Sequence, residues 1–298
     1  MNTELICAVS EPCLLGESPF WHPIENALYW CDIAAHRLYR LDPVSGASRH
    51  WQFDAELASC APVLGGGLLL AMRDGLWGFD PATGRRERLA RPPYDPAAQR
   101  FNDGKCDPQG RFWVGTIDDR REPNAALYRW AGGRLDRCAS GITTSIGLGW
   151  SLDGATRYWS DTKAHRIDAF DFDVADGSLS RRRTHVQFPL REAGQPLTGY
   201  GGRPDGAAVD AQGFYWVAMY EGQRLLRLTP DGMVCGEVPL PVRCPTMPCF
   251  GGRDLKTLYI TTARDGRPES ELQTQPMAGC VLALAVDVPG LPVYFARP

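Results

Sequence analysis

The chain of 298 residues carries 32 Lys and Arg against 35 Asp and Glu, which gives a formal net charge of -3 at pH 7. This balance builds no basic surface for nucleic acid, and no stretch reaches the ~18 apolar residues of a membrane span. The densest basic run, 181–183, follows an Asp-Gly-Ser turn and is typical of a solvated hairpin. We therefore expect a protein that binds neither nucleic acid nor membranes.

Cysteine and histidine usage narrows the class further. The ten cysteines are spread from Cys7 to Cys280 without a CxxC pair, and residues 1–10 lack the basic and apolar regions of a secretory signal. We expect reduced thiols in a cytoplasmic protein. The five histidines show neither HxxxH nor HExxH spacing, which argues against a histidine-based zinc site. The many Gly, Pro and aromatic residues favour strands and turns over helices.

One pattern recurs six times along the chain. Each copy contains a short strand, a tight turn of Asp, Gly or Pro, and a second strand of alternating aromatic and aliphatic residues. The copies cover residues 16–32, 60–71, 101–116, 146–161, 204–218 and 248–261. A third strand is predicted after each of them, over 36–41, 75–79, 126–130, 166–170, 224–228 and 279–284.

The spacing of the copies predicts the fold. Equivalent positions in the six copies are Trp21, Val63, Asp107, Trp150, Asp210 and Phe250. Their separations are 42, 44, 43, 60 and 40 residues, and a period of about 40 to 45 residues with four strands is typical of propeller blades. The sequence thus predicts an all-β, six-bladed β-propeller that forms a single domain over residues 1–298.

Two further features of the propeller follow. The long fourth separation indicates an insertion between Asp171 and Gly202, which we expect as a loop over 188–201 on one face of the disc. A ring must also be closed, because a free last sheet would leave an exposed edge. The N-terminal segment 4–9 is predicted to complete the last blade beside 281–286.

The innermost strands of a propeller line its channel, so equivalent positions form a ring. Counting back three to five residues from each marker gives Glu17, Ser59, Asn102, Ile146, Asp205, and Thr246 or Met247. Asp-Gly pairs often form plain turns, and Glu17 alone is compatible with a surface position. Their common register favours a site, since two facing buried carboxylates repel unless a cation or proton lies between them. Oxygen ligands suit Ca²⁺, Mg²⁺ or Mn²⁺, with Zn²⁺ and Fe²⁺ as further candidates.

Four of these segments resemble those of a known family. The segments Leu15–Trp21, Arg100–Lys105, Gly147–Ser151 and Pro204–Gly206 are similar to hallmarks of the gluconolactonase family, which includes regucalcin. The resemblance extends from about Glu11 to Ala263. It implies a six-bladed propeller and, as in many members, a metal-dependent hydrolase that opens sugar lactones.

The resemblance also implies roles for particular residues. Glu17 and Asp205 correspond to metal ligands, and Arg100 and Asn102 to contacts with the substrate. The family usually has Asn as a third ligand in a Ser-Asn-Gly-Leu segment, whereas this chain has Ile146, which cannot coordinate a metal.

Three arrangements remain compatible with this departure. Asn102 or a water molecule completes a weaker metal site; or Thr144 or Ser145 supplies an oxygen through a local bulge; or the site works without metal. In the last case Asp205 serves as the base and Arg100 as the electrostatic stabiliser. The implied cofactor is therefore a divalent metal (Ca, Zn, Mg, Mn or Fe) or none.

The predicted activity is hydrolysis of a sugar-derived lactone to its aldonic acid, with Asp205 as the catalytic base. Asp118 and Glu122, in the loop after a third-blade strand, are candidates to contact sugar hydroxyls, or are solvated loop charges. The expected partner is a small sugar lactone, and the expected oligomeric state is a monomer or weak homodimer.

The alternative function is that of a non-catalytic propeller that binds a ligand or calcium, which Ile146 favours. The sequence contains no GxSxG, GxxxxGK[ST] or helix-linked GxGxxG motif.

Overall fold

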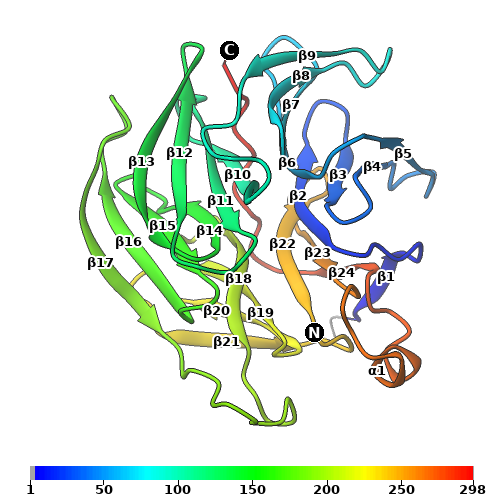
Figure 1. The fold of residues 1–298 in the computed structure, drawn as a ribbon. Helices are drawn as coiled ribbons and strands as arrows, with labels where there is room; N and C mark the ends of the chain where they lie inside the picture. The colour runs from blue at the N-terminus through cyan, green and yellow to red at the C-terminus, as the bar shows by residue number, and fades with distance from the viewer. Residues whose placement is uncertain (1–3, 298) are drawn as a thin grey trace.

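The computed structural model describes residues 4–297 and shows, within that range, six four-stranded antiparallel sheets around a central channel (Figure 1). The predicted six-bladed β-propeller is confirmed. Blade 1 consists of β2 (Gly16–His22), β3 (Ala27–Asp32), β4 (Arg37–Leu41) and β5 (Ser48–Gln52). Blade 2 consists of β6 (Leu57–Pro62), β7 (Leu68–Met72), β8 (Gly75–Phe79) and β9 (Arg86–Ala90). Blade 3 consists of β10 (Gln99–Cys106), β11 (Phe112–Asp118), β12 (Ala125–Ala131) and β13 (Arg134–Ile142).

The remaining blades repeat this order. Blade 4 consists of β14 (Ser145–Trp150), β15 (Thr156–Asp161), β16 (Arg166–Phe172) and β17 (Leu179–Gln187). Blade 5 consists of β18 (Arg203–Val209), β19 (Tyr215–Tyr220), β20 (Arg224–Leu228) and β21 (Val234–Pro239). Blade 6 consists of β22 (Pro245–Gly251), β23 (Thr257–Thr262), β24 (Val281–Ala285) and β1 (Ile6–Val9). All six predicted third strands therefore form.

The N-terminal strand closes the ring as predicted. β1 pairs antiparallel with β24, with Ile6 opposite Ala283. The last blade thus takes its outer strand from the first residues that the structure describes, and the two ends of the propeller are held together by hydrogen bonds. The predicted insertion is also confirmed, since β17 ends at Gln187 and β18 begins at Arg203.

The repeat in the sequence has a direct structural cause in two of the blades. The Asp107 carboxylate accepts a hydrogen bond from Trp113 Nε1 at 2.8 Å and pairs with Arg111 at 2.6 Å. Asp210 accepts the corresponding bond from Trp216 Nε1 at 3.0 Å. In each case a buried Asp at the end of the innermost strand satisfies the indole N–H of the second strand, which would otherwise be an unpaired buried donor.

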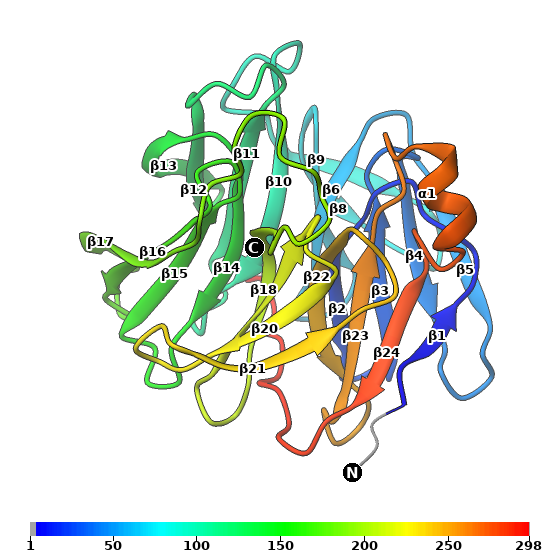
Figure 2. The same ribbon diagram turned by 90° about the horizontal axis from the view of Figure 1, so that it is seen from below.

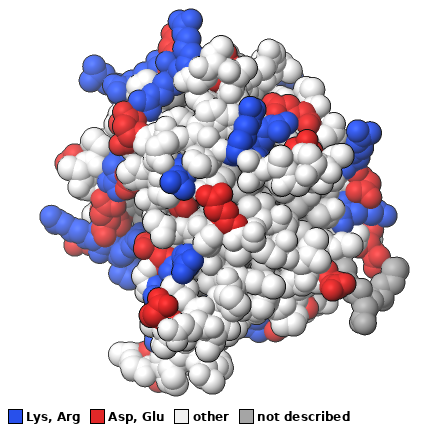
Figure 3. All heavy atoms as spheres, turned by 90° about the vertical axis from the view of Figure 1, so that its right-hand side faces the viewer, with Lys and Arg blue, Asp and Glu red and all other residues white. Residues whose placement is uncertain are grey.

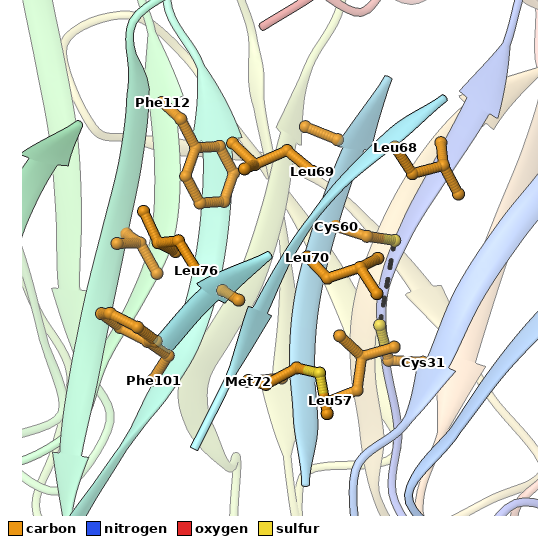
Figure 4. Close-up of a cluster of buried hydrophobic side chains, with 14 of the residues drawn as sticks. Cys31, Leu57, Cys60, Leu68, Leu69, Leu70, Met72, Leu76, Phe101 and Phe112 are labelled. Carbon is orange, nitrogen blue, oxygen red and sulfur yellow. Dashed lines mark hydrogen bonds between the residues drawn. The ribbon is translucent and has the colours of Figure 1, made fainter. Parts of the chain in front are cut away.

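The core lies within and between the blades. The second strand of blade 2, β7, is buried along its whole length because the neighbouring blades cover both of its faces. Figure 4 shows its leucines packed between Phe112 on one side and the pair Cys31 and Cys60 on the other. The sulfur atoms of Cys31 and Cys60 are 3.9 Å apart, and all ten cysteines are free thiols.

Segments outside the blades cover the two faces of the disc. A short helix, α1 (Glu269–Thr274), lies in the connection between β23 and β24, and the C-terminal tail after β24 lies on the opposite face (Figure 2). No helix among residues 4–297 combines the length and apolar character needed to cross a membrane. On the face drawn in Figure 3, acidic and basic side chains are interspersed.

The C-terminal tail crosses the channel. Its backbone bonds to Val209 of blade 5 through Leu291, and to Pro62 of blade 2 through Ala296. Blades 2 and 5 face each other across the ring. Residues 291–296 therefore form a strap over the end of the channel at which the innermost strands finish, as the red segment in Figure 1 shows. The sequence repeat does not extend into this segment.

Candidate active site at one end of the channel

All six innermost strands depart from regular pairing at the same height. The register shifts fall at Glu17/Phe20, Leu57/Ser59, Phe101/Gly104, Ile146/Gly149, Pro204/Ala207 and Pro245/Met247. Such bulges change the direction of side chains and often occur beside active sites.

Glu17 and Asp205 are both buried at this level, at 5% and 6% exposure. Burial raises the pKa of Glu17 well above its usual value, and the charges of Asp205 and Asp103 raise it further. Burial likewise raises the pKa of Asp205 to about 7, although Arg203 and a hydrogen bond from Thr162 oppose the shift. The Thr162 hydroxyl donates to Asp205 Oδ1 at 3.2 Å. The structure thus places the two predicted carboxylates close enough to repel each other.

Asp103 is a third carboxylate in the channel that sequence reasoning missed. It is 1% exposed; its Oδ2 accepts the backbone N–H of Leu148 at 2.9 Å, and its Oδ1 has no hydrogen-bond partner. In a regular strand, neighbours such as Asn102 and Asp103 point to opposite faces. The bulge between Phe101 and Gly104 removes that restriction, and the sequence carries no signal for the bulge beyond Gly104 itself.

Arg100 and Asn102 form one hydrogen-bonded unit. Arg100 Nη1 donates to Asn102 Oδ1 at 2.9 Å, and Asn102 Nδ2 donates to the Ser145 carbonyl at 3.0 Å. Burial lowers the pKa of Arg100 to about 10, and the positive charge of Arg121 adds to this. Arg100 therefore still carries its charge at neutral pH. The Asn102 amide is fixed at both ends, with one Oδ1 lone pair left for another partner.

The fourth blade has the apolar Ile146 at its ring position. Ile146 is buried, and Gly147 after it has φ +66°, with its carbonyl accepting the Tyr215 hydroxyl at 2.7 Å. Both oxygens of Ser145 are already hydrogen-bonded, because Oγ accepts Trp159 Nε1 at 2.6 Å and the carbonyl accepts Asn102. The register shift of this strand falls between Ile146 and Gly149, after Ser145, so no bulge turns Ser145 toward the ring. Thr144, the other predicted donor, is half-buried just before β14.

The other predicted positions have mostly local contacts. Asp118 Oδ1 accepts the backbone N–H of Arg120 and of Glu122 at 3.0 and 3.3 Å, so its carboxylate organises its own loop. Glu122 is exposed and accepts a hydrogen bond from Asn124 at 3.2 Å. In the ring itself, Thr246 Oγ1 donates to the carbonyl of Gly16 at 2.5 Å and joins blade 6 to blade 1.

The donor set fits a divalent cation only in part. Glu17 and Asp205 are buried carboxylates with raised pKa values, which is the environment that a hard cation relieves. Residues 4–297 contain no group of three or more His, Cys, Asp or Glu arranged to hold a metal. Ile146 adds no ligand. The residues present therefore fit a site in which two carboxylates hold the metal. Such a site binds a metal with lower affinity than one with a third protein ligand.

A cavity of about 740 Å³ occupies the other end of the channel. Its walls come from the second halves of the innermost strands, including Phe20, Trp150 and Phe250, and from 291–294 of the tail. Lys105 also lines it and crosses from blade 3 to donate to the Ala207 carbonyl of blade 5. Glu17, Asn102 and Asp205 are not among its lining residues, so this cavity lies away from the carboxylates.

The architecture and the segments that line the channel agree with one protein family. The chain belongs to the SMP-30/gluconolactonase/LRE-like family, whose model matches residues 15–264. The predicted family membership is therefore confirmed, and the match covers blades 1 to 5 and the two inner strands of blade 6.

Particular relatives are similar over nearly their whole length. The chain is 44% identical over 292 residues to the 6-deoxy-6-sulfogluconolactonase of Pseudomonas putida, covering 97% of each chain. It is 34% identical over 303 residues to the regucalcin of Oryctolagus cuniculus, covering 98% of each. Among solved structures, a calcium-binding regucalcin from Agrobacterium tumefaciens superposes with a TM-score of 0.91 at 27% identity, covering 98% of this chain and 97% of that one.

Proposed function

We propose that this protein is a lactonase that hydrolyses a sugar-derived lactone to its aldonic acid at the carboxylate end of the channel. The observation that carries the proposal is Asp205, a buried carboxyl group whose pKa is raised to about 7. A catalytic base is most effective when its pKa lies near the working pH. The gluconolactonase family and the sulfogluconolactonase relative support the same activity.

Asp205 is assigned the role of general base. Its Oδ1 accepts the Thr162 hydroxyl, which fixes the carboxylate and leaves Oδ2 to take a proton from the attacking water. Burial keeps the proton affinity of Asp205 high, and the negative charge of Asp103 adds to this. General base catalysis of this kind contributes about 10²- to 10⁴-fold in rate.

Arg100 and Asn102 are assigned to the substrate. The buried guanidinium retains its positive charge at neutral pH and can stabilise negative charge that develops on the lactone carbonyl oxygen. Its hydrogen bond to Asn102 holds both groups in one orientation, so little reorganisation is needed when the substrate binds. Asp118 and Glu122 stay predicted contacts of the sugar hydroxyls, and the exposed Glu122 is the freer of the two.

A divalent metal, if bound, would be held by Glu17 and Asp205, with Asn102 Oδ1 as a further predicted ligand. It would supply polarisation of the lactone carbonyl and a more acidic bound water. The name of the Agrobacterium relative makes calcium a candidate. With or without a metal, Glu17 is assigned to hold a cation or a proton beside Asp205. Two adjacent buried carboxyl groups do not both ionise unless a positive charge lies between them.

A non-catalytic propeller that binds a ligand or calcium is the second candidate. Ile146 favours it, since it replaces a ligand of the family pattern with an apolar side chain. A pH-drop assay on a panel of sugar lactones, run with chelator and with added metals, separates the two candidates. Turnover that is lost in Asp205→Asn supports the lactonase. No turnover of any lactone in either condition leaves only the binding protein.

Activity that neither chelator nor metal changes would remove the metal from the mechanism but keep the base. The matched control for Asp205→Asn is Asp119→Asn. It also removes one carboxylate, but Asp119 lies in the exposed loop after β11 and pairs with Arg73. Its turnover is expected to stay within about twofold of the parent, since exposed ion pairs have small effects.

A further inference from the structure

The entrance to the carboxylate site carries positively charged side chains that the proposed mechanism does not use. Arg121 lies in the loop 119–124 after β11, Lys163 in the turn after β15, and Arg203 at the start of β18. We propose that Arg121 and Arg203 bind an anionic group on the lactone, at the end of the sugar remote from the reacting carbonyl. This inference rests on the proposed lactonase function and names its substrate class.

Contacts around Asp205 bring these residues to one place. Thr162 donates to Asp205, and the next residue, Lys163, donates from Nζ to the backbone carbonyl of Arg121 at 2.7 Å. Arg203 is two positions before Asp205 on β18. The positive charge of Arg121 also acts on the site below it, where it lowers the pKa of both Arg100 and Asp205.

The backbone presents Arg121 in an unusual way. Its φ of +61° lies in the left-handed region, which non-glycine residues rarely adopt. The Lys163 contact to its carbonyl and the hydrogen bond from its N–H to the Asp118 carbonyl at 2.9 Å hold that conformation. No salt bridge of the Arg121 side chain is present among the residues that the structure describes, and the side chain is exposed. Its guanidinium is therefore available to a ligand.

Arg203 belongs to a network with an excess of positive charge. It pairs with Glu221 at 3.3 Å, and Glu221 also pairs with Arg267 at 3.2 Å. Arg267 and Arg243 share Glu271, at 2.7 and 3.6 Å. Three arginines thus share two glutamates. The Nε of Arg203 is buried and has no hydrogen-bond partner, so a donor of this network is left for another acceptor.

The polarity of the channel orients such a substrate. Glu17, Asp103 and Asp205 are acidic groups buried at the reacting end, where a further anion is disfavoured. Arg100 is the buried cation beside them, whereas the exposed Arg121 and Lys163 stand at the entrance. A lactone with a sulfonate, phosphate or carboxylate on its far end would place that group at Arg121 and Arg203 and its carbonyl toward Asp205.

The test compares substrates that differ only in that group. We would measure kcat/KM for glucono-δ-lactone and for the corresponding lactones with a 6-sulfonate, a 6-phosphate and a 6-carboxylate. The anionic lactones are expected to react about tenfold faster than the neutral one at low salt, with the preference falling as salt screens the charges. The order among the three anions identifies which acid the site takes.

Variants connect the preference to the residues. Arg121→Gln is expected to lower the ratio of kcat/KM for the anionic lactones to that for the neutral lactone about fivefold, with Arg121→Lys restoring part of the ratio. The matched control, Arg85→Gln, removes the same charge in an exposed turn of blade 2 and should leave the ratio unchanged. Equal rates for neutral and anionic lactones in the parent would overturn the inference and leave the lactonase standing.

Binding provides a readout that does not need turnover. Calorimetric titration with the open-chain 6-sulfonated aldonate and with gluconate, on the parent and on Arg121→Gln, measures the same preference on the product. Tighter binding of the anionic acid that disappears in the variant supports the inference even when no lactone reacts. Equal binding of the two acids would overturn it.

Discussion

The two ends of the channel are built from the same six strands and have opposite character. The first halves of the innermost strands carry the bulges and the carboxylates Glu17, Asp103 and Asp205. The second halves form the mostly apolar walls of a cavity of about 740 Å³, closed by the tail. In each of the six strands a bulge of one residue lies between the part that carries the site and the part that lines the cavity.

The two ends of the channel also differ in their contribution to the stability of the fold. Three mutually repelling carboxylates are buried at the site, and the pKa values of all three are raised. At the other end, the tail bonds to blades on both sides of the ring. We infer that the site end is retained for activity at the expense of stability, and that the strap end contributes stability without touching the chemistry.

The largest expected effect is on the reactive end. Asp205→Asn removes the proposed base but keeps the shape of the side chain, and should lower kcat about 10³-fold. The pH-drop assay measures it, with Asp119→Asn as the control. A loss of less than about tenfold would assign the base to another group, and Glu17→Gln would then be the next variant to assay.

Ile146→Asn tests the ligand that the fourth blade lacks. Asparagine at this position offers a carbonyl oxygen beside Glu17 and Asp205, so the affinity for a divalent metal should rise about 10- to 100-fold. Metal titration followed by calorimetry measures the change. The control is Ile146→Leu, which adds no oxygen and should bind metal as the parent does. Unchanged affinity in Ile146→Asn would show that the carboxylates alone do not position a metal.

The sequence predicted the ring but not its details. The blades were predictable because each repeats the same contacts, such as those of Asp107 with Trp113 and Asp210 with Trp216. Asp103 was not predicted, because strand alternation places it away from Asn102 and only the bulge changes that. The cavity and the strap could not be predicted, since the tail carries no copy of the repeat and its course depends on distant backbone partners.

The pH dependence should distinguish activity from stability. Because the pKa of Asp205 is about 7, the rate without added metal should fall about tenfold from pH 8 to pH 6 as the base is protonated. Stability should change in the opposite direction. The raised pKa means that the folded protein holds this proton more strongly than the unfolded chain, so the contribution is fully present below about pH 4, the pKa of Asp in the unfolded chain, and is lost as the pH rises from there through about 7.

Thermal unfolding in chelator measures the stability difference, with Asp205→Asn as the comparison. The variant has no charge to bury, so it should be more stable than the parent at pH 8, and the difference should shrink toward about pH 4, near the pKa of Asp in the unfolded chain. If the parent is instead the more stable protein at pH 8, the charge of the Asp205 carboxylate is compensated in the folded protein. The carboxylate end of the channel would then not lower the stability of the fold.

The smallest effect on activity is expected at the strap. Gly290 lies where the tail turns under blade 6, and a Cβ at this position would lie 2.1 Å from Cγ of Phe250. Gly290→Ala should therefore destabilise the fold by about 1–3 kcal/mol through overpacking, while kcat/KM stays within about twofold because the carboxylates are at the other end. The matched control is Gly266→Ala, in an exposed connection where a Cβ meets nothing within 4 Å. That control tests the strain of a left-handed glycine (φ +66°) alone. A Gly290→Ala protein that unfolds at a lower temperature yet also loses activity well below that temperature would show that the strap and the site are coupled through the innermost strands.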